Sequence, residues 1–219
     1  LLGRNAAALE EVDDAVRRVA GGAGATLVPF DLRDHAAIDR LGGALYERHG
    51  RLDILVGNAG LLGTLTPLPQ IRPEEWDEVL AVNLTANWRL IRSLDPLLRL
   101  SPAGRAIFVT SGAAKAPRAY WGSYAVTKAA LEMLAGIYAA ETARTAVRVN
   151  LVDPGRLRTR MRARAYPGED PATVPEPDSV TEVFVALAEE ACTRHGEIVR
   201  VPAAPAGAAP APAAGRQAG

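Results

Sequence analysis

The sequence predicts an α/β protein of the Rossmann-like type, a doubly wound parallel sheet in three layers. Short apolar segments alternate with longer amphipathic ones, an order typical of parallel strands joined by helices that cover both faces. The 219 residues, 48% of them hydrophobic, suffice for one large α/β domain with a sizeable core. Small and polar residues follow several apolar segments, at the sheet edge where such folds bind ligands. We therefore expect one domain over residues 1–201.

Five apolar segments are expected to form the strands of this sheet. ATLVPF, residues 25–30, lies between glycines and Asp31, and such a short apolar run bounded by turn residues is typical of a buried strand. Because helical patterns separate the segments, the strands should run parallel with right-handed crossovers. The other four segments are residues 51–60, 105–112, 147–155 and 196–201.

The amphipathic segments between the strands predict helices. The first follows Asn5, a residue type that caps helix N-termini. The third begins with Pro73, Glu74 and Glu75, a first turn that the fixed φ of proline and the helix dipole both favour. The expected helices are residues 6–19, 35–48, 73–94, 122–143 and 178–191.

Charge and composition exclude several classes of protein. The 25 basic and 25 acidic residues balance, so the net charge does not draw the chain to nucleic acid or to an anionic membrane. Cys192 is the single cysteine, which rules out an internal disulfide, and no apolar run approaches the roughly 20 residues of a membrane span. We expect a protein of the cytoplasm that acts on a small molecule. No metal site is expected, because the three histidines fit no metal-ligand spacing: His35, His49 and His195.

The last residues, 202–219, are rich in alanine, proline and glycine and hold almost nothing to bury. Such a composition does not form a packed core. We predict a disordered segment outside the domain, and its function does not follow from its sequence.

Tyr124 and Lys128 stand four residues apart in an expected helix, so their side chains share one face. Tyrosine has an ordinary pKa of about 10, and a nearby cation favours the phenolate. We therefore expect Lys128 to lower the pKa of Tyr124, and the pair to move a proton at a carbonyl or alcohol oxygen. The alternative is an ordinary helix that happens to hold a tyrosine and a lysine.

Ser111 ends the third expected strand, thirteen residues before Tyr124. In this fold the end of a strand and the start of the next helix both open to the ligand crevice, so the serine hydroxyl could bond the same substrate oxygen. The alternative for Ser111 is a turn residue. Asn83 lies inside an expected helix, where asparagine is a mediocre helix former. It bends the helix, holds a water or is tolerated on a polar face.

The order of these motifs resembles that of the short-chain dehydrogenase/reductase family, over about residues 1–201. GNAG at residues 57–60 is similar to a family motif, although the family usually has a second asparagine where this chain has Gly57. The family's serine, tyrosine, lysine and helix asparagine match in spacing, and its P-G-x-x-x-T pattern matches NLVDPGRLRT. YPGEDP, residues 166–171, resembles a subgroup of bacterial members known only as oxidoreductases. This resemblance does not identify a substrate.

The resemblance implies an enzyme that transfers hydride between NAD(H) or NADP(H) and a carbonyl/alcohol pair. Tyr124 would protonate the carbonyl oxygen, Ser111 would orient it, and Lys128 would lower the tyrosine pKa and bind the nicotinamide ribose. Asn83 would anchor a water chain that returns the proton through Lys128, and Asp31 would contact the adenine ring. The implied cofactor contacts are Arg4, Asp31, Leu32, Asn58, Ala59, Gly60, Tyr124, Lys128, Pro154, Gly155, Leu157 and Thr159.

LLGRN, residues 1–5, looks like the end of the second strand of the family fold, where NAD-dependent members usually place an acid. Arg4 suits a 2′-phosphate instead, so the sequence favours NADP(H) over NAD(H), with a solvated arginine as the alternative. A glycine-rich turn that would hold the pyrophosphate follows none of the expected strands. We therefore expect a fragment that lacks the first strand and helix of the fold and is inactive or unstable by itself.

The segment after Thr159 corresponds to the family's lid over the substrate, and its four prolines argue against one continuous helix. Tyr120 and Trp121, beside the catalytic tyrosine, line an apolar pocket or simply pack. The alternating arginines meet an acidic or phosphorylated substrate or form a solvated face: Arg158, Arg160, Arg162 and Arg164.

Family members commonly form oligomers through the helices that hold Asn83 and Tyr124, so a homodimer or homotetramer is expected. Two rival functions share the fold. One is a 3-oxoacyl-thioester reductase of fatty-acid synthesis, which has all of these motifs. The other is a non-catalytic binding or scaffold module, against which the intact serine, tyrosine and lysine argue.

Overall fold

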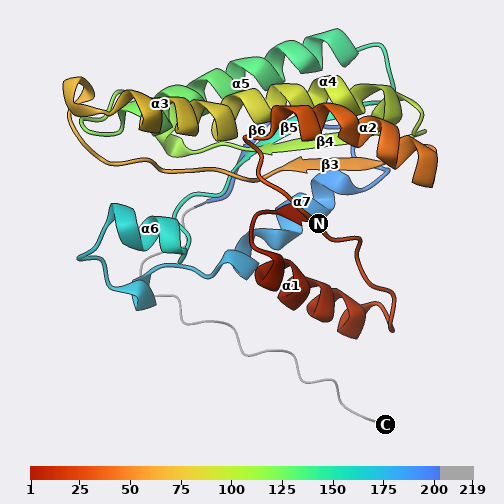
Figure 1. The fold of residues 1–219 in the computed structure, drawn as a ribbon, viewed down its shortest axis with the longest axis horizontal. Coiled ribbons are helices and arrows are strands. Elements are labelled where there is room, and N and C mark those ends of the chain that lie inside the picture. The colour runs from red at the N-terminus through yellow and green to blue at the C-terminus, as the bar shows by residue number, and fades with distance from the viewer. Residues whose placement is uncertain (203–219) are drawn as a thin grey trace.

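A four-stranded parallel sheet forms the centre of the computed structural model, which describes residues 1–202 (Figure 1). Its strands, hydrogen-bonded in chain order, are β3 (Ile54–Gly57), β4 (Arg105–Val109), β5 (Arg148–Asp153) and β6 (Glu197–Arg200). A separate parallel pair consists of β1 (Leu2–Gly3) and β2 (Val28–Pro29). The predicted α/β fold with parallel strands is confirmed. The expected tail, 202–219, lies outside the described residues apart from Pro202.

Helices cover both faces of the four-stranded sheet (Figure 1). One face carries α2, α4 and α5, and the other carries α7, with α1 on that same side. The three predicted layers are therefore present. The helices are α1 (Ala6–Val19), α2 (His35–His49), α3 (Pro73–Leu80), α4 (Ala86–Arg99), α5 (Gly122–Thr142), α6 (Arg160–Ala165) and α7 (Thr181–Ala188).

The core is divided between the two faces of the sheet, as the alternation along β4 shows. Phe108, with 0% of its surface exposed, packs in one cluster with Ile38 of α2 and Leu131 of α5. The preceding residue, Ile107, packs instead with Leu187 of α7. Successive strand side chains point to opposite faces, so a strand covered on both sides is apolar at nearly every position.

The first two expected strands, 25–30 and 51–60, are shorter in the structure, where they are β2 and β3. Only Val28–Pro29 of the expected strand 25–30 are in β2, which pairs with the two residues of β1. β3 is an edge of its sheet, with Ile54 43% and Val56 46% exposed. The pair of β1 and β2 is a sheet separate from that of β3 to β6.

Two predicted helices are divided in the structure. The helix expected over 73–94 consists of α3, a π-helical turn over Ala81–Thr85 and α4. The helix expected over 178–191 is a 3-10 turn, Pro177–Val180, followed by α7. Another 3-10 turn, Pro171–Thr173, separates these from α6, so the prediction that prolines break the lid segment is confirmed.

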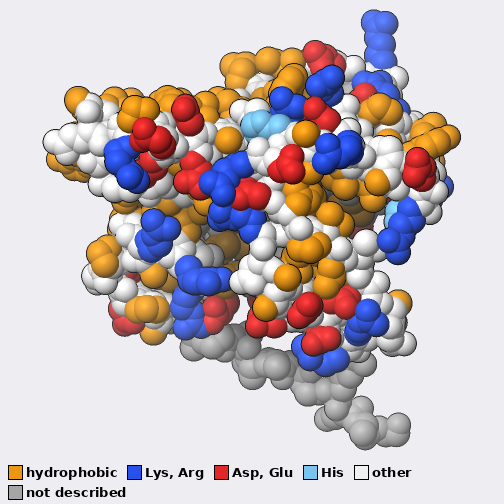
Figure 2. Space-filling model, in the orientation of Figure 1, with side chains coloured by type: hydrophobic (Ala, Val, Ile, Leu, Met, Phe, Trp, Pro, Cys, Tyr) orange, Lys and Arg blue, Asp and Glu red, His pale blue; other side chains and the backbone are white. Residues whose placement is uncertain are grey.

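The surface of the described residues mixes both signs of charge. Figure 2 shows acidic and basic side chains interspersed over the visible face, in keeping with the zero net charge. None of the helices in residues 1–202 is long and apolar enough to cross a membrane.

Candidate active site

A cavity of about 660 Å³ lies at the carboxyl ends of β3, β4 and β5, beside the first turns of α5. Parallel strands put their carboxyl ends at one edge, which brings together segments that are far apart in the chain. Four predicted site residues do not line this cavity: Arg4, Asp31, Leu32 and Asn83. The predicted site residues that line the cavity are Asn58, Ala59, Gly60, Ser111, Tyr124, Lys128, Pro154, Gly155, Leu157 and Thr159.

Tyr124 and Lys128 lie on the face of α5 that meets the sheet, and they are 8% and 3% exposed. The Lys128 ammonium lies 5.8 Å from the centre of the tyrosine ring, and it donates a hydrogen bond to the Val109 carbonyl at 2.8 Å. Because Val109 ends β4, this bond ties the helix to the strand that carries Ser111. The two side chains that sequence spacing places on one face are therefore neighbours at the cavity.

Burial governs the ionisation of both groups. Desolvation of the ammonium lowers the pKa of Lys128 to about 8. Burial raises the pKa of Tyr124, a shift that the Ser111 hydroxyl opposes and the Asp153 carboxylate reinforces. The expectation that the tyrosine pKa is lowered is therefore wrong for the protein by itself. The phenol loses its hydration when it is buried, and the sequence pattern contains no measure of that loss.

Ser111 follows β4 and begins a 3-10 turn, Gly112–Ala114. Its hydroxyl oxygen accepts a hydrogen bond from the N–H of Ala113 at 3.3 Å. A serine hydroxyl both accepts and donates, so this contact holds the side chain while its proton remains available for donation toward the cavity. The turn interpretation and the catalytic interpretation of Ser111 are thus compatible.

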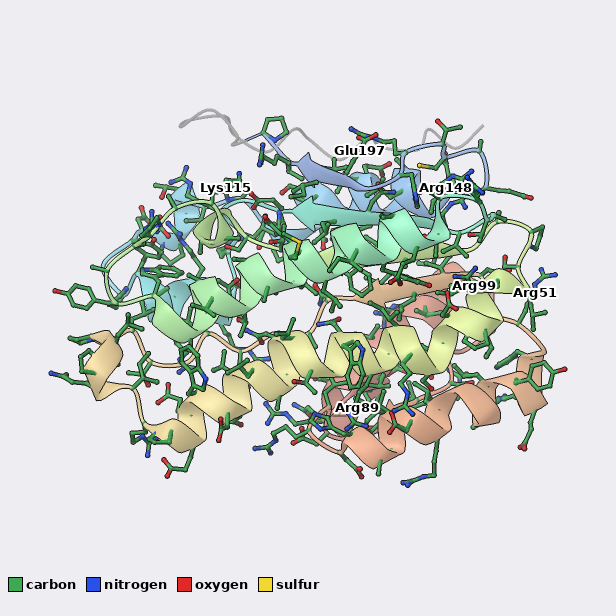
Figure 3. All side chains as sticks on the ribbon, turned by 90° about the horizontal axis from the view of Figure 1, so that it is seen from above. Arg51, Arg89, Arg99, Lys115, Arg148 and Glu197 are labelled. Carbon is green, nitrogen blue, oxygen red and sulfur yellow. The ribbon has the colours of Figure 1, made fainter. Side chains whose placement is uncertain are left out.

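Lys115 and Asp153, which the sequence analysis does not single out, connect two walls of the site. Their ion pair is 3.0 Å long, and the Asp153 carboxylate also accepts from the Gly155 N–H at 3.3 Å. Figure 3 labels Lys115 at the end of the sheet opposite Arg148 and Glu197. The pair holds the turn after β5 against the turn after β4. Asp153 stands at a strand end in the sequence, but its partner is visible only in three dimensions.

Asn83 is fully buried in the π-helical turn between α3 and α4. Its amide accepts from the Leu61 N–H at 2.7 Å and donates to the Leu61 carbonyl at 2.9 Å and the Thr127 hydroxyl at 3.0 Å. A Cβ atom added at Gly60 would lie 3.5 Å from both Asn83 Oδ1 and Lys128 Nζ. The helix is π-helical at this asparagine, and the amide holds the Leu61 loop against it.

Gly57 occupies the position where the family usually has an asparagine. It pairs with Phe108 in the neighbouring strand, and an added Cβ atom would lie 2.6 Å from Cδ1 of that ring. Real Cβ atoms essentially never approach so closely. The Asn87 amide lies nearer still, so that side chain and the buried phenylalanine together leave no room for a Cβ atom at this position.

Arg4 and Asp31 lie beside each other at the ends of β1 and β2, 3.7 Å apart. Arg33, which the sequence analysis does not single out, binds the same carboxylate at 2.6 Å, and this hydrogen bond lowers the pKa of Asp31. Two guanidinium groups therefore surround one carboxylate. Leu32, expected at the cofactor, packs against the hydrophobic core.

The alternating arginines after β5 differ in their surroundings. Arg158 pairs with Glu176, in agreement with a solvated, charge-paired face. Arg162 binds both oxygens of Glu169 at 2.6 Å and also lines the cavity. Arg160 lines the cavity as well.

Trp121 lines the cavity, which decides between the two interpretations that its sequence context allows. Leu62, Met161 and Tyr166 do so as well, although the sequence analysis does not single them out. They lie on loops and on the short helix α6, where no hydrophobic periodicity identifies the side that faces a ligand.

The model of the short chain dehydrogenase family matches residues 1–170. Among curated proteins, the uncharacterized oxidoreductase YciK of Escherichia coli (strain K12) is 39% identical over 137 residues, 63% of this chain and 54% of that protein. The uncharacterized NAD-dependent oxidoreductase MT0715 of Mycobacterium tuberculosis (strain CDC 1551 / Oshkosh) is 36% identical over 154 residues, 69% of this chain and 56% of that protein. The chain thus spans about half the length of these curated relatives.

A solved structure gives the same result at the level of the fold. The crystal structure of a short chain dehydrogenase from Escherichia coli CFT073, complexed with NADPH, is similar with a TM-score of 0.86 and 32% identity. The likeness covers 91% of this chain and 84% of that chain. Together with the family match over residues 1–170, it shows that this chain belongs to the short chain dehydrogenase family.

Proposed function

We propose that this member of the family is an NAD(P)-dependent oxidoreductase that interconverts a carbonyl compound and its alcohol. One observation carries the proposal: a buried tyrosine and a buried lysine lie side by side at a cavity that Ser111 also lines. A phenol, an ammonium and a hydroxyl in that arrangement can hold an oxygen atom and give it a proton.

The residues at the cavity fit a nicotinamide dinucleotide. An ammonium has three N–H donors, and the hydrogen bond that Lys128 makes within residues 1–202 uses one, toward Val109. Its other donors suit the neighbouring hydroxyls of a ribose. The backbone at Gly60 and Gly155 can approach a ligand closely, and Gly155 has a φ of 71°, which favours glycine. When bound, the cofactor supplies hydride to the carbonyl carbon or takes it from the alcohol.

In reduction, Tyr124 acts as the general acid. Its phenol keeps its proton at neutral pH because burial raises its pKa, and it donates that proton to the carbonyl oxygen. Ser111 donates a hydrogen bond to the same oxygen and orients it. Lys128, charged below a pH of about 8, stabilises the phenolate that remains. Asn83 positions the Leu61 loop beside Lys128. We also propose that it anchors a chain of waters that returns the proton through Lys128.

The test is a carbonyl panel given to the purified full-length protein with NADPH or NADH. The panel contains ketones, aldehydes and a 3-oxoacyl thioester. We expect nucleotide oxidation with equal formation of alcohol, and faster with NADPH. Reduction confined to the thioester would favour the fatty-acid-synthesis reductase. Nucleotide binding without reduction of any carbonyl would contradict the proposal and favour a non-catalytic module.

We infer a preference for NADP(H) from the two guanidinium groups at the ends of β1 and β2. Arg4 and Arg33 both lie near the position that the family fold gives to the adenosine ribose, and arginine suits a phosphate. The structural relative from Escherichia coli CFT073 is complexed with NADPH, which supports this choice. The relative from Mycobacterium tuberculosis is named NAD-dependent, so the preference needs its own test.

Replacing Arg4 with glutamine is expected to raise the KM for NADPH about tenfold and to leave the KM for NADH nearly unchanged. The reason is the loss of one charge-assisted contact to the 2′-phosphate, worth about 1.5 kcal/mol at an exposed site. Steady-state kinetics with both nucleotides measures it. The matched control is Arg40→Gln, an exposed arginine of α2. Equal changes for both nucleotides would contradict the assignment.

A homodimer or homotetramer is proposed through α4 and α5. Val126, Met133 and Ile137 of α5 and Trp88 of α4 are large apolar side chains that are exposed in the single chain. A row of such side chains on neighbouring helices suits a partner of the same chain.

A further inference from the structure

Three aromatic rings stand in a row along the cavity, and they come from two separate parts of the chain. Trp121 precedes α5, and its ring lies 5.9 Å from that of Tyr124 in an edge-to-face arrangement at 65°. On its other side, Tyr166 lies 5.9 Å from Trp121 at 44°. All three line the same cavity. Trp121 and Tyr166 thus form an aromatic wall that begins one ring away from the proposed general acid.

Charged side chains hold Tyr166 in place at its hydroxyl and at one face. Arg118 donates a hydrogen bond to the Tyr166 hydroxyl at 2.6 Å, and its guanidinium lies 5.2 Å from the centre of the Trp121 ring. Arg162 lies 3.6 Å from the centre of the Tyr166 ring and is itself fixed by two hydrogen bonds to Glu169. The wall is therefore set before a ligand arrives, and a ligand does not have to order it.

Apolar side chains contribute further surface to the cavity, whose lining also includes Arg160 and Arg162 of α6. The apolar ones are Leu62, Leu157, Met161 and Ala165. A substrate with its carbonyl oxygen at Ser111 and Tyr124 would place its adjoining substituent against apolar and aromatic surface. Flat rings gain more from aromatic neighbours than flexible chains do, because they pack edge-to-face or offset and have few rotamers to lose.

We propose that Trp121 and Tyr166 determine substrate specificity, and that the substrate is a ketone or aldehyde with a flat apolar ring next to its carbonyl group. This inference rests on the proposed function, because it names the substrate class of the same site. Arg118 acts as a positioning residue that holds Tyr166 against Trp121.

The experiment compares acetophenone with 2-octanone, a straight-chain ketone of equal carbon count, in the full-length protein with NADPH. We expect wild type to favour acetophenone in kcat/KM, and Tyr166→Leu to lower that preference about tenfold. Tyr166→Phe keeps the ring and should keep most of the preference. The matched control is Tyr46→Leu, which removes an exposed tyrosine of α2. A purely structural role of Tyr166 would lower both rates alike and leave their ratio unchanged.

A second measurement needs no turnover. Saturation-transfer NMR should detect acetophenone binding to wild type and not to Tyr166→Leu. Circular dichroism checks that both proteins are folded. An unchanged ketone ratio in Tyr166→Leu would overturn the inference while leaving the proposed function intact. No NADPH oxidation by wild type would instead count against the proposed function, and the NMR comparison would then decide the ring preference. If Tyr166→Leu does not fold, Trp121→Leu carries the same comparison.

Discussion

The Tyr124→Phe variant is expected to reduce carbonyl substrates with a kcat about 10²- to 10⁴-fold lower than wild type, the range that general acid catalysis contributes. The substitution removes one hydroxyl group and keeps the ring that packs against Trp121. Because the phenol is the proton donor in the proposed reaction, its loss should act on the chemical step. The KM for NADPH should change little, and nucleotide binding measured by fluorescence titration should be retained.

A second tyrosine of α5 supplies the matched control. Tyr138 is buried like Tyr124, but its hydroxyl donates to Asp95 at 2.9 Å and it does not line the cavity. Tyr138→Phe should lower the free energy of unfolding by about 1 kcal/mol through the lost hydrogen bond and leave kcat near wild type. Full turnover by Tyr124→Phe would remove this residue from the mechanism. Equal loss in both variants would point to a general effect on α5.

The Lys128→Met variant is expected to lower kcat/KM by about 10²-fold or more. The loss combines two effects, the removal of a charged contact and the impairment of proton transfer. Methionine has a similar length and fills the buried site without a charge. The Val109 carbonyl loses its donor, and the phenolate loses the cation that stabilises it. Steady-state kinetics should also show that a decline in activity above a pH of about 8, present in wild type, is absent from the variant.

The same variant gives a stability prediction whose sign follows from the buried ammonium. Desolvation lowers the pKa of Lys128 to about 8 in the folded protein, against an ordinary value near 10.5. Below a pH of about 8 the folded state carries a charge that burial penalises, and between about 8 and about 10.5 it loses that charge while the unfolded chain keeps it. Wild type should therefore gain stability relative to Lys128→Met across this interval. Chemical unfolding of both proteins measures it, and parallel pH curves would contradict it.

Much of the fold follows from local pattern. β4 is apolar from Ala106 to Phe108, and the structure buries side chains on both of its faces. The spacing of Tyr124 and Lys128 predicts neighbours on one helix face, and the structure places them there. The π-helical turn inside the helix expected over 73–94 does not follow from local pattern, since the Asn83 amide in it is bonded to Leu61, on a separate loop.

The sequence by itself determined the fold class, the parallel direction of the strands and the meeting of residues that follow β3, β4 and β5 at one edge of the sheet. These depend on periodicity and on the geometry of parallel strands, which are properties of segments. Only the tertiary structure decided that the pKa of Tyr124 rises, that Lys115 pairs with Asp153, and that Arg118 holds Tyr166 against Trp121. Desolvation and contacts between distant segments produce these features, and both arise only when the chain has packed.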